Sequence, residues 1–174
     1  MEDRHPRPGS RGELSASNNS MRPSSLRIEV FWIGKTRLGG VATLTEEYGL
    51  RLGRYCDFHG AEARPVRKKG ERASEEAAIL TRSEGSFRVV LDTAGKQWCS
   101  SEFARFIAKL RDRGKRTVTF CVGGAEGFST EFRDRADLLL SLSPLTLPHE
   151  LARVVLLEQL YRAFTTLAGH PYPR

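Results

Sequence analysis

The sequence predicts an α/β domain with a mainly parallel sheet and helices on its faces. Short, β-branched apolar segments alternate along the chain with longer segments in which apolar residues recur every three to four positions. This is the pattern of strands joined by helical crossovers. A glycine-rich loop follows one late strand and a proline-bounded loop follows the next. Such loops at the carboxyl ends of parallel strands are typical of a small-molecule site.

Length and composition limit the classes of protein to be considered. The 174 residues, with 39% hydrophobic and 28% charged, suit one soluble domain with a real core. No apolar run approaches the roughly 20 residues of a membrane span. The first residues lack the apolar segment of a secretory signal, so we do not expect one. Three cysteines without a CxxC pair and four histidines without ligand spacing disfavour disulfides and a metal site. We therefore expect a cytoplasmic protein with no membrane or metal partner.

The charge of the chain points to an anionic partner. The formal net charge is +7 and the isoelectric point is about 9.7, which favours binding to a polyanion. The alternative is a solvated basic surface without a dedicated partner. Composition favours RNA over DNA only weakly, because no helix-turn-helix, zinc finger or basic zipper pattern is present.

The first part of the chain gives a tail and then alternating elements. Residues 1–25 are rich in Ser, Asn, Pro, Gly and Arg, so they are expected to be a disordered tail ahead of a single domain, 26–174. Met21 is an alternative start of translation. The elements expected next are a strand over Arg27–Ile33, a helix over Val41–Phe58, a strand over Ala61–Val66, a basic loop at Arg67–Lys69 and a helix over Glu71–Arg82.

The second part continues the alternation. It predicts a buried strand over Phe87–Asp92 followed by a loop at Thr93–Lys96, a helix over Glu102–Arg113 capped by Ser101 and stopped by Gly114, a strand over Thr117–Val122 and a strand over Leu138–Leu142. A last helix, Glu150–Leu167, follows Pro148 and carries two apolar stripes, Leu151/Val154/Val155 and Leu156/Leu160/Phe164. One sheet needs only one stripe, so the second favours a homodimer. The alternative is a helix buried within one domain.

The loop after the strand at 117–122 reads Gly123-Gly124-Ala125-Glu126-Gly127. It lacks the Gly-Lys-Ser/Thr of a P-loop and the GxGxxG of a dinucleotide site. Either a close approach to a ligand or a merely tight turn explains its glycines. His149 stands at a helix N-terminus, which disfavours a protonated imidazole; a capping role there is the alternative to hydrogen bonding a ligand.

Together these motifs resemble a known family. GGAEG, then SLSPLTLPHELARVVLLEQLYRAF, then the terminal HPY, with LDxxGKxW at 91–98, resemble the RlmH family of small SPOUT-class methyltransferases, which modify N3 of a pseudouridine in 23S ribosomal RNA. The resemblance spans about 26–174. It implies a SPOUT-type C-terminal trefoil knot, a homodimer, 23S rRNA in the ribosome as partner, and S-adenosylmethionine as cofactor.

The resemblance also assigns site residues. The cofactor contacts that it implies fall on Leu91, Gly123, Gly124, Leu142, Ser143, Pro144, Leu145, Thr146 and Leu147. Near the target base it implies His149, Arg153, Tyr172 and Arg174, with the partner subunit as a further contributor. Phosphate contacts are expected among Lys35, Arg37, Arg67, Lys68 and Lys96. The family ending is similar to HPYH, whereas this chain has Pro173 in place of the last histidine, which puts catalysis or RNA placement by the tail in question.

Two other functions stay open beside pseudouridine methylation. One is a SPOUT RNA methyltransferase with another target nucleotide. The other, suggested by Pro173, is a catalytically weak protein that binds the ribosome or S-adenosylmethionine.

Overall fold

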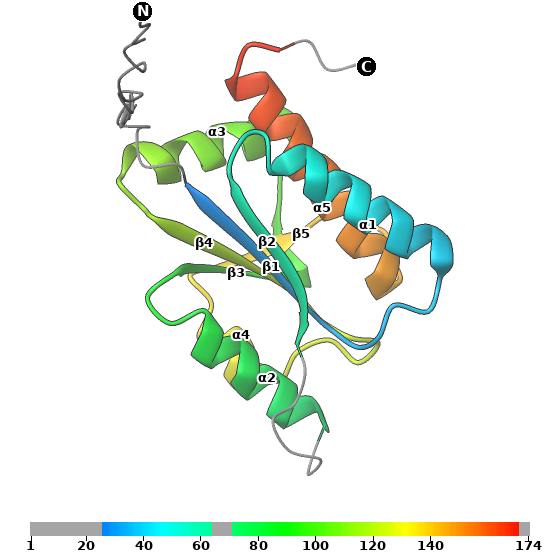
Figure 1. The fold of residues 1–174 in the computed structure, drawn as a ribbon. Coiled ribbons are helices and arrows are strands. Elements are labelled where there is room, and N and C mark those ends of the chain that lie inside the picture. The colour runs from blue at the N-terminus through cyan, green and yellow to red at the C-terminus, as the bar shows by residue number, and fades with distance from the viewer. Residues whose placement is uncertain (1–25, 64–70, 171–174) are drawn as a thin grey trace, which may run out of the picture.

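The computed structural model describes residues 26–63 and 71–170, which form a parallel five-stranded sheet between two layers of helices (Figure 1). The strands lie in the order β2-β1-β4-β3-β5, and each neighbouring pair is parallel. Their bounds are β1 Arg27–Ile33, β2 Asp57–Ala63, β3 Phe87–Gln97, β4 Thr117–Val122 and β5 Leu138–Ser141. The α/β class with a mainly parallel sheet is confirmed.

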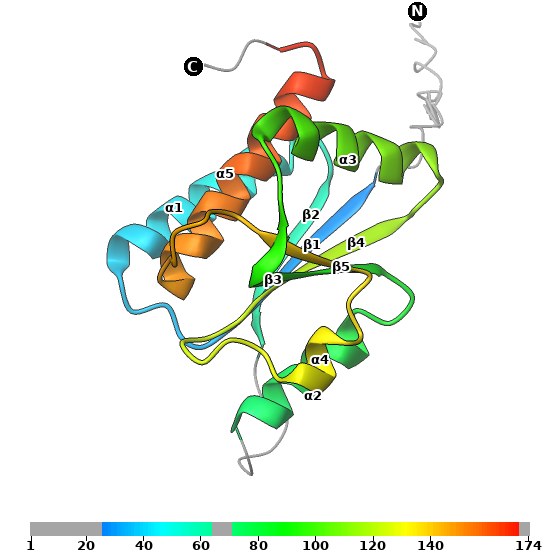
Figure 2. The same ribbon diagram turned by 180° about the vertical axis from the view of Figure 1, so that it is seen from behind.

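Helices cover both faces of the sheet. In Figures 1 and 2, α1, α3 and α5 lie on one face and α2 and α4 on the other. Their bounds are α1 Gly39–Leu52, α2 Glu71–Arg82, α3 Ser100–Asp112, α4 Thr130–Arg133 and α5 His149–Leu167. The crossover helices explain why the sheet is buried on two sides.

The strands divide their side chains between two cores. In β1, Ile28 and Val30 enter the core beneath α1, α3 and α5, whereas Phe31 and Ile33 enter the core beneath α2 and α4. Successive side chains of a strand point to opposite faces. Where both faces are covered, apolar residues are needed on both, which is why β4 and β5 appear in the sequence as apolar runs.

The second element of the chain is shorter than predicted, and the next strand begins earlier. Helix α1 ends at Leu52, not at Phe58, and β2 starts at Asp57 where Ala61 was expected. Residues 57–63 pair with β1 along its whole length, so strand pairing outweighs the helical spacing of Tyr55 and its neighbours. The remainder of the predicted strand, with the basic loop at Arg67–Lys69, lies outside the described residues.

Strand β3 extends through the segment that was predicted to be a loop. It continues to Gln97, and its register with β5 shifts between Leu91 and Lys96. A Cβ added to Gly95 would lie 2.6 Å from the backbone of Leu140. Glycine is therefore required there for the backbones of β3 and β5 to lie this close together. The trefoil knot stays a prediction.

The starts of α3 and α5 and the short helix α4 also differ from the sequence-based expectation. Cys99 precedes α3 in place of Ser101, and its N–H donates to Glu102 at 2.9 Å, one half of a capping box. The short helix α4 was not predicted, because four residues give no apolar period; Ser129 caps it. Helix α5 starts one residue early, at His149. Among the described residues, no helix has the length and apolar character needed to cross a bilayer.

Candidate functional site

A cavity of about 430 Å³ opens at the carboxyl ends of β3, β4 and β5. This volume lies within the range of small-molecule sites. Three segments build most of its wall: the end of β3, the glycine turn after β4 and the loop after β5. The residues of these segments and of α5 that line it include Leu91, Asp92, Gly123, Gly124, Glu126, Gly127, Arg133, Leu142, Ser143, Leu145, Thr146, Leu147 and His149. Of the residues that the resemblance assigned to the cofactor, only Pro144 is not part of this lining.

The glycine turn folds tightly on itself. Gly127 has φ +65°, and its N–H donates to the Gly124 carbonyl at 3.0 Å. A Cβ on Gly123 would lie 3.0 Å from the Gly127 Cα, and one on Gly124 would lie 3.2 Å from Ile33 Cγ2. The turn is thus both tight and close to the cavity. The left-handed residue is the last glycine, and the first two are needed for their small size.

The loop between β5 and α5 holds its shape through its own hydrogen bonds. Ser141 donates its hydroxyl to the Ser143 carbonyl at 3.0 Å, and the Leu145 N–H donates to Ser143 Oγ at 2.9 Å. This second contact spans two residues, as in the serine turns that stabilise loops. Leu142, Leu145 and Leu147 add apolar surface to the cavity, although Leu145 is 75% exposed.

Two charged residues that sequence reasoning did not assign to the site face each other in the wall. Arg133 Nη1 lies 3.2 Å from Asp92 Oδ2, and Arg133 Nη2 donates to Thr130 Oγ1 at 3.3 Å. Asp92 also accepts the Ala94 N–H at 2.8 Å. Asp92 belongs to the LDxxGK motif and was thus within reach of sequence reasoning. Arg133 stands on the four-residue helix α4 and had no such signal.

The first turn of α5 joins the cavity to the loop after β1. His149 lines the cavity, and its neighbour Glu150 is only 7% exposed. The Glu150 carboxylate accepts the backbone N–H groups of Arg37 and Leu38 at 3.1–3.2 Å. These hydrogen bonds lower the pKa of Glu150. The loop between β1 and α1, residues 34–38, is thereby fixed beside the cavity.

Arg153 lies one helical turn after His149 on α5 and does not line the cavity. Its side chain is 1% exposed and donates to Thr36 Oγ1 at 2.8 Å. Its guanidinium carbon lies 4.3 Å from the centre of the Trp32 ring, a cation–π distance. Burial lowers the pKa of Arg153. Its Nε and the indole N–H of Trp32 are buried donors that have no hydrogen-bond partner among the described residues.

The other two residues assigned near the target base, Tyr172 and Arg174, lie outside the described residues. The end of the described chain is nonetheless informative. His170 follows the C-terminus of α5 and its Nδ1 lies 2.9 Å from the Tyr55 hydroxyl. Helix α5 has 19 residues and is about 28 Å long. His149 and the start of the terminal segment thus lie at opposite ends of one helix.

Within residues 26–63 and 71–170, no group of three or more His, Cys, Asp or Glu side chains is placed to hold a metal ion. Cys56 and Cys121 are buried and Cys99 is exposed, all as free thiols.

Solved structures support the fold at low sequence identity. The tRNA (m1G37) methyltransferase from Aquifex aeolicus aligns with a TM-score of 0.54 at 15% identity, over 86% of this chain and 75% of that one. A probable methyltransferase from Bordetella pertussis aligns with a TM-score of 0.55 at 12% identity, over 81% of this chain and 98% of that one.

Sequence comparisons cover nearly the whole described domain. The family model described as "Predicted SPOUT methyltransferase" matches residues 26–173. A protein named ribosomal RNA large subunit methyltransferase H from Koribacter versatilis is 42% identical over 150 residues, which are 84% of this chain and 97% of that protein. One of the same name from Allorhizobium ampelinum is 39% identical over 159 residues, 86% of this chain and 99% of that protein. The chain therefore belongs to the SPOUT methyltransferase family, and within it to the group of ribosomal RNA large subunit methyltransferase H.

Proposed function

We propose that this protein transfers a methyl group from S-adenosylmethionine to N3 of a pseudouridine in 23S rRNA of the large ribosomal subunit. The observation that carries the proposal is the convergence of the Gly123–Gly127 turn and the 142–147 loop on one cavity, in a chain 42% identical to a protein named for methylation of this RNA.

The residues of the cavity fit this cofactor. Leu142, Leu145 and Leu147 offer apolar surface for the adenine and the methionine carbon chain, and Gly123 and Gly124 leave room for the ribose. Arg133 can pair with a carboxylate, whereas Asp92 and Glu126 suit an ammonium or sulfonium charge. When bound, S-adenosylmethionine supplies an electrophilic methyl group.

Positioning should provide most of the rate, because methyl transfer is an in-line displacement. The N3 proton of the base has to leave, and a base or a nearby cation favours the resulting anion. Of the described residues assigned near the target base, His149 lines the cavity and Arg153 does not, so we assign His149 to hydrogen bonding the target base. Arg153 acts from behind, through Thr36 and Trp32. Tyr172 and Arg174 complete the set in our proposal.

We further propose a homodimer in which the terminal segment of one subunit completes the site of the other. Helix α5, with 19 residues, separates His149 from His170 by about 28 Å, so the terminal segment starts far from the His149 of its own subunit. Four exposed leucines offer a surface for the partner near the starts of α1 and α5 and on the cavity loop: Leu38, Leu44, Leu145 and Leu151. Val154 and Val155, in the same stripe of α5 as Leu151, are only half-buried.

The RNA surface is proposed to include the basic residues around the cavity. Lys35, Arg37 and Lys96 are exposed and can neutralise phosphates, and Arg67 and Lys68 are assigned to the same role. A protein that methylates ribosomal RNA is expected in the cytoplasm, where we place it. The trefoil knot that the resemblance implies completes the proposal.

Mass spectrometry of rRNA tests the function directly. Cells that lack the protein should lose one methyl group from a large-subunit pseudouridine, and the gene should restore it. A methyl lost from another nucleotide would identify a different SPOUT target. An unchanged pattern, together with retained binding of S-adenosylmethionine, would identify a catalytically weak binding protein. No binding at millimolar cofactor in calorimetry would overturn both enzymatic assignments.

A further inference from the structure

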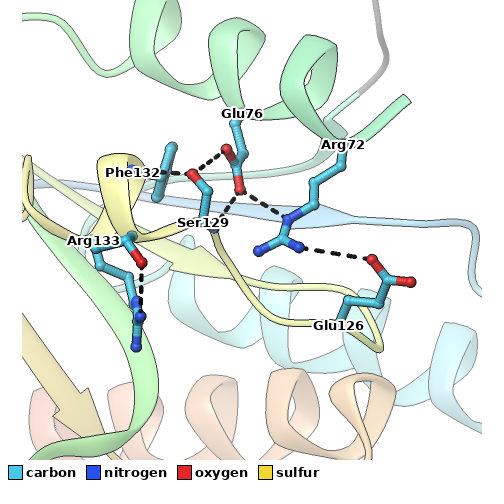
Figure 3. A network of polar contacts seen from close by, with 7 residues as sticks. Arg72, Glu76, Glu126, Ser129, Phe132 and Arg133 are labelled. Carbon is cyan, nitrogen blue, oxygen red and sulfur yellow. Dashed lines mark hydrogen bonds and ion pairs between the residues drawn. The ribbon is translucent and has the colours of Figure 1, made fainter. Parts of the chain in front are cut away.

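A buried carboxylate on α2 reaches the far end of the glycine turn. Glu76 is 7% exposed. One of its oxygens accepts the Ser129 backbone N–H at 2.7 Å, and the other accepts the Ser129 hydroxyl at 2.7 Å (Figure 3). Both distances are short, as expected of hydrogen bonds to an ionised acceptor. Ser129 is thus held through its backbone and its side chain by a single carboxylate.

Ser129 transmits this constraint in two directions. Toward the C-terminus, its Oγ accepts the Phe132 N–H at 3.1 Å and caps α4, the helix that carries Arg133. Toward the N-terminus, it is continuous with Glu126, Gly127 and Phe128, which line the cavity. One serine therefore fixes both the turn and the helix that form this side of the cavity wall.

Arg72 makes a second, more exposed connection between α2 and the glycine turn. Its Nε lies 3.4 Å from Glu76, and its Nη1 lies 3.6 Å from Glu126 (Figure 3). The side chains of Arg72 and Glu126 are 40% and 82% exposed, so this pair contributes little. The connection that holds the turn is the buried one, through Glu76.

Neither Arg72 nor Glu76 lines the cavity. Their effect on a bound molecule has to pass through the turn. The glycines of the turn have high conformational freedom, and a free loop must be ordered when a ligand binds. A contact that orders the loop beforehand reduces this cost and raises affinity.

We infer that Glu76 is a positioning residue for the cofactor site: it holds the 123–129 segment in its ligand-binding form before the cofactor arrives. The inference rests on the proposed function for the identity of the cofactor. Helix α2, which does not line the cavity, would thus contribute to the affinity for S-adenosylmethionine.

Hydrogen exchange of the cofactor-free protein and calorimetry with S-adenosylmethionine test this together. Glu76→Ala should remove the protection of the Ser129 and Gly127 amides and weaken cofactor binding by about tenfold or more, the loss expected for a charged hydrogen bond. Glu76→Gln retains an acceptor for the Ser129 N–H and should recover part of both. Glu84→Ala removes an exposed carboxylate just after α2 and should change neither.

The alternatives give different results. If Glu76 only stabilises the fold, Glu76→Ala lowers the melting temperature but keeps the wild-type affinity well below it, and the inference fails. It also fails if Glu76→Gln binds as weakly as Glu76→Ala. Wild-type protein that does not bind S-adenosylmethionine would overturn the proposed function instead, and loss of amide protection in Glu76→Ala would still report on the role of Glu76 in ordering the turn.

Discussion

Two loops beside the cavity are each held by one buried carboxylate, but only one of the two loops lines the cavity. Glu76 holds the 123–129 segment through Ser129, and Glu150 holds the 34–38 loop through the Arg37 and Leu38 N–H groups. The first segment lines the cavity, whereas the second does not. The second instead exposes two basic side chains, Lys35 and Arg37.

The difference suggests that one loop serves cofactor binding and the other serves RNA binding at the same site. A segment that lines the cavity governs affinity for the small molecule inside it. A basic loop that lies outside the cavity, and is fixed to the same helix as His149, suits the RNA that must approach the site. Substitutions in the two regions should therefore affect different measurements, and the following experiments test that separation.

The largest effect is expected for Gly123→Val, on the cofactor side. Even a Cβ at this position would lie 3.0 Å from the Gly127 Cα, so a branched side chain must displace the turn. Calorimetry should detect no binding of S-adenosylmethionine, while gel filtration should show the oligomeric state of the wild type. Gly40→Val is the control, because an added Cβ there meets nothing within 4 Å. Retained affinity in Gly123→Val would place the cofactor elsewhere.

On the RNA side, the double substitution Lys35→Ser and Arg37→Ser should weaken RNA binding without changing cofactor affinity. Each lost phosphate contact reduces the slope of log K against log salt by about 0.7 to 0.9. Binding of an rRNA fragment should therefore lose about 1.4 to 1.8 from this slope. Lys109→Ser with Arg111→Ser, on the exposed last turn of α3, is the matched control. An equal loss in the control would mean that the 34–38 loop has no special role.

Glu150→Ala should have a smaller effect in the same direction, because it releases the loop but keeps its charges. The N–H groups of Arg37 and Leu38 lose their acceptor, and the loop gains freedom. We expect a several-fold rise in KM for RNA with cofactor affinity unchanged. Steady-state kinetics with each substrate varied separately measure this. A rise in the cofactor Kd equal to that for Glu76→Ala would abolish the distinction between the two carboxylates.

Sequence reasoning found the cavity but neither carboxylate. The glycine turn and the loop bounded by Pro144 and Pro148 were predicted from the sequence, because unusual backbone geometry requires glycine and proline. The assignment of residues 142–147 to the cofactor came from the family resemblance. Glu76 lies in an Ala- and Glu-rich helix that is expected to have a solvated face. Its partner Ser129 is 53 residues away, so only the folded chain pairs them. Glu150 is similarly separated from Arg37.

The same limit explains the errors in the fold. The order and type of most elements follow from local periodicity, and Glu71–Arg82 was predicted with its observed bounds. The end of α1 and the start of β2 were wrong because pairing with β1 decides them. Residues 93–97 join β3 through contacts with Leu140 and Ser141, which lie far along the chain. Long-range pairing has no counterpart in a local pattern.

The pH dependence of stability tests whether the ionised carboxylate of Glu150 stabilises the fold. Its pKa is lowered in the folded protein, mainly by the Leu38 and Arg37 N–H groups. A group with a lowered pKa contributes stability that is present above its unfolded value, about 4.3 for Glu, and is lost as pH falls through the folded value. Denaturation at pH 7 should show the wild type to be more stable than Glu150→Gln. The difference should shrink on acidification; a constant difference would mean that the ionised form is not what the loop requires.

The smallest effect is expected for Arg72→Ala, the outer contact on the cofactor side. Its ion pair with Glu126 spans 3.6 Å between side chains that are 40% and 82% exposed, and such pairs contribute about 0.2–1 kcal/mol. Cofactor affinity should fall by no more than about fivefold, and added salt should reduce the difference from the wild type. Glu76 would retain both contacts to Ser129. If Arg72→Ala weakens the cofactor as much as Glu76→Ala does, then the guanidinium organises the turn, and the buried carboxylate serves mainly to orient Arg72.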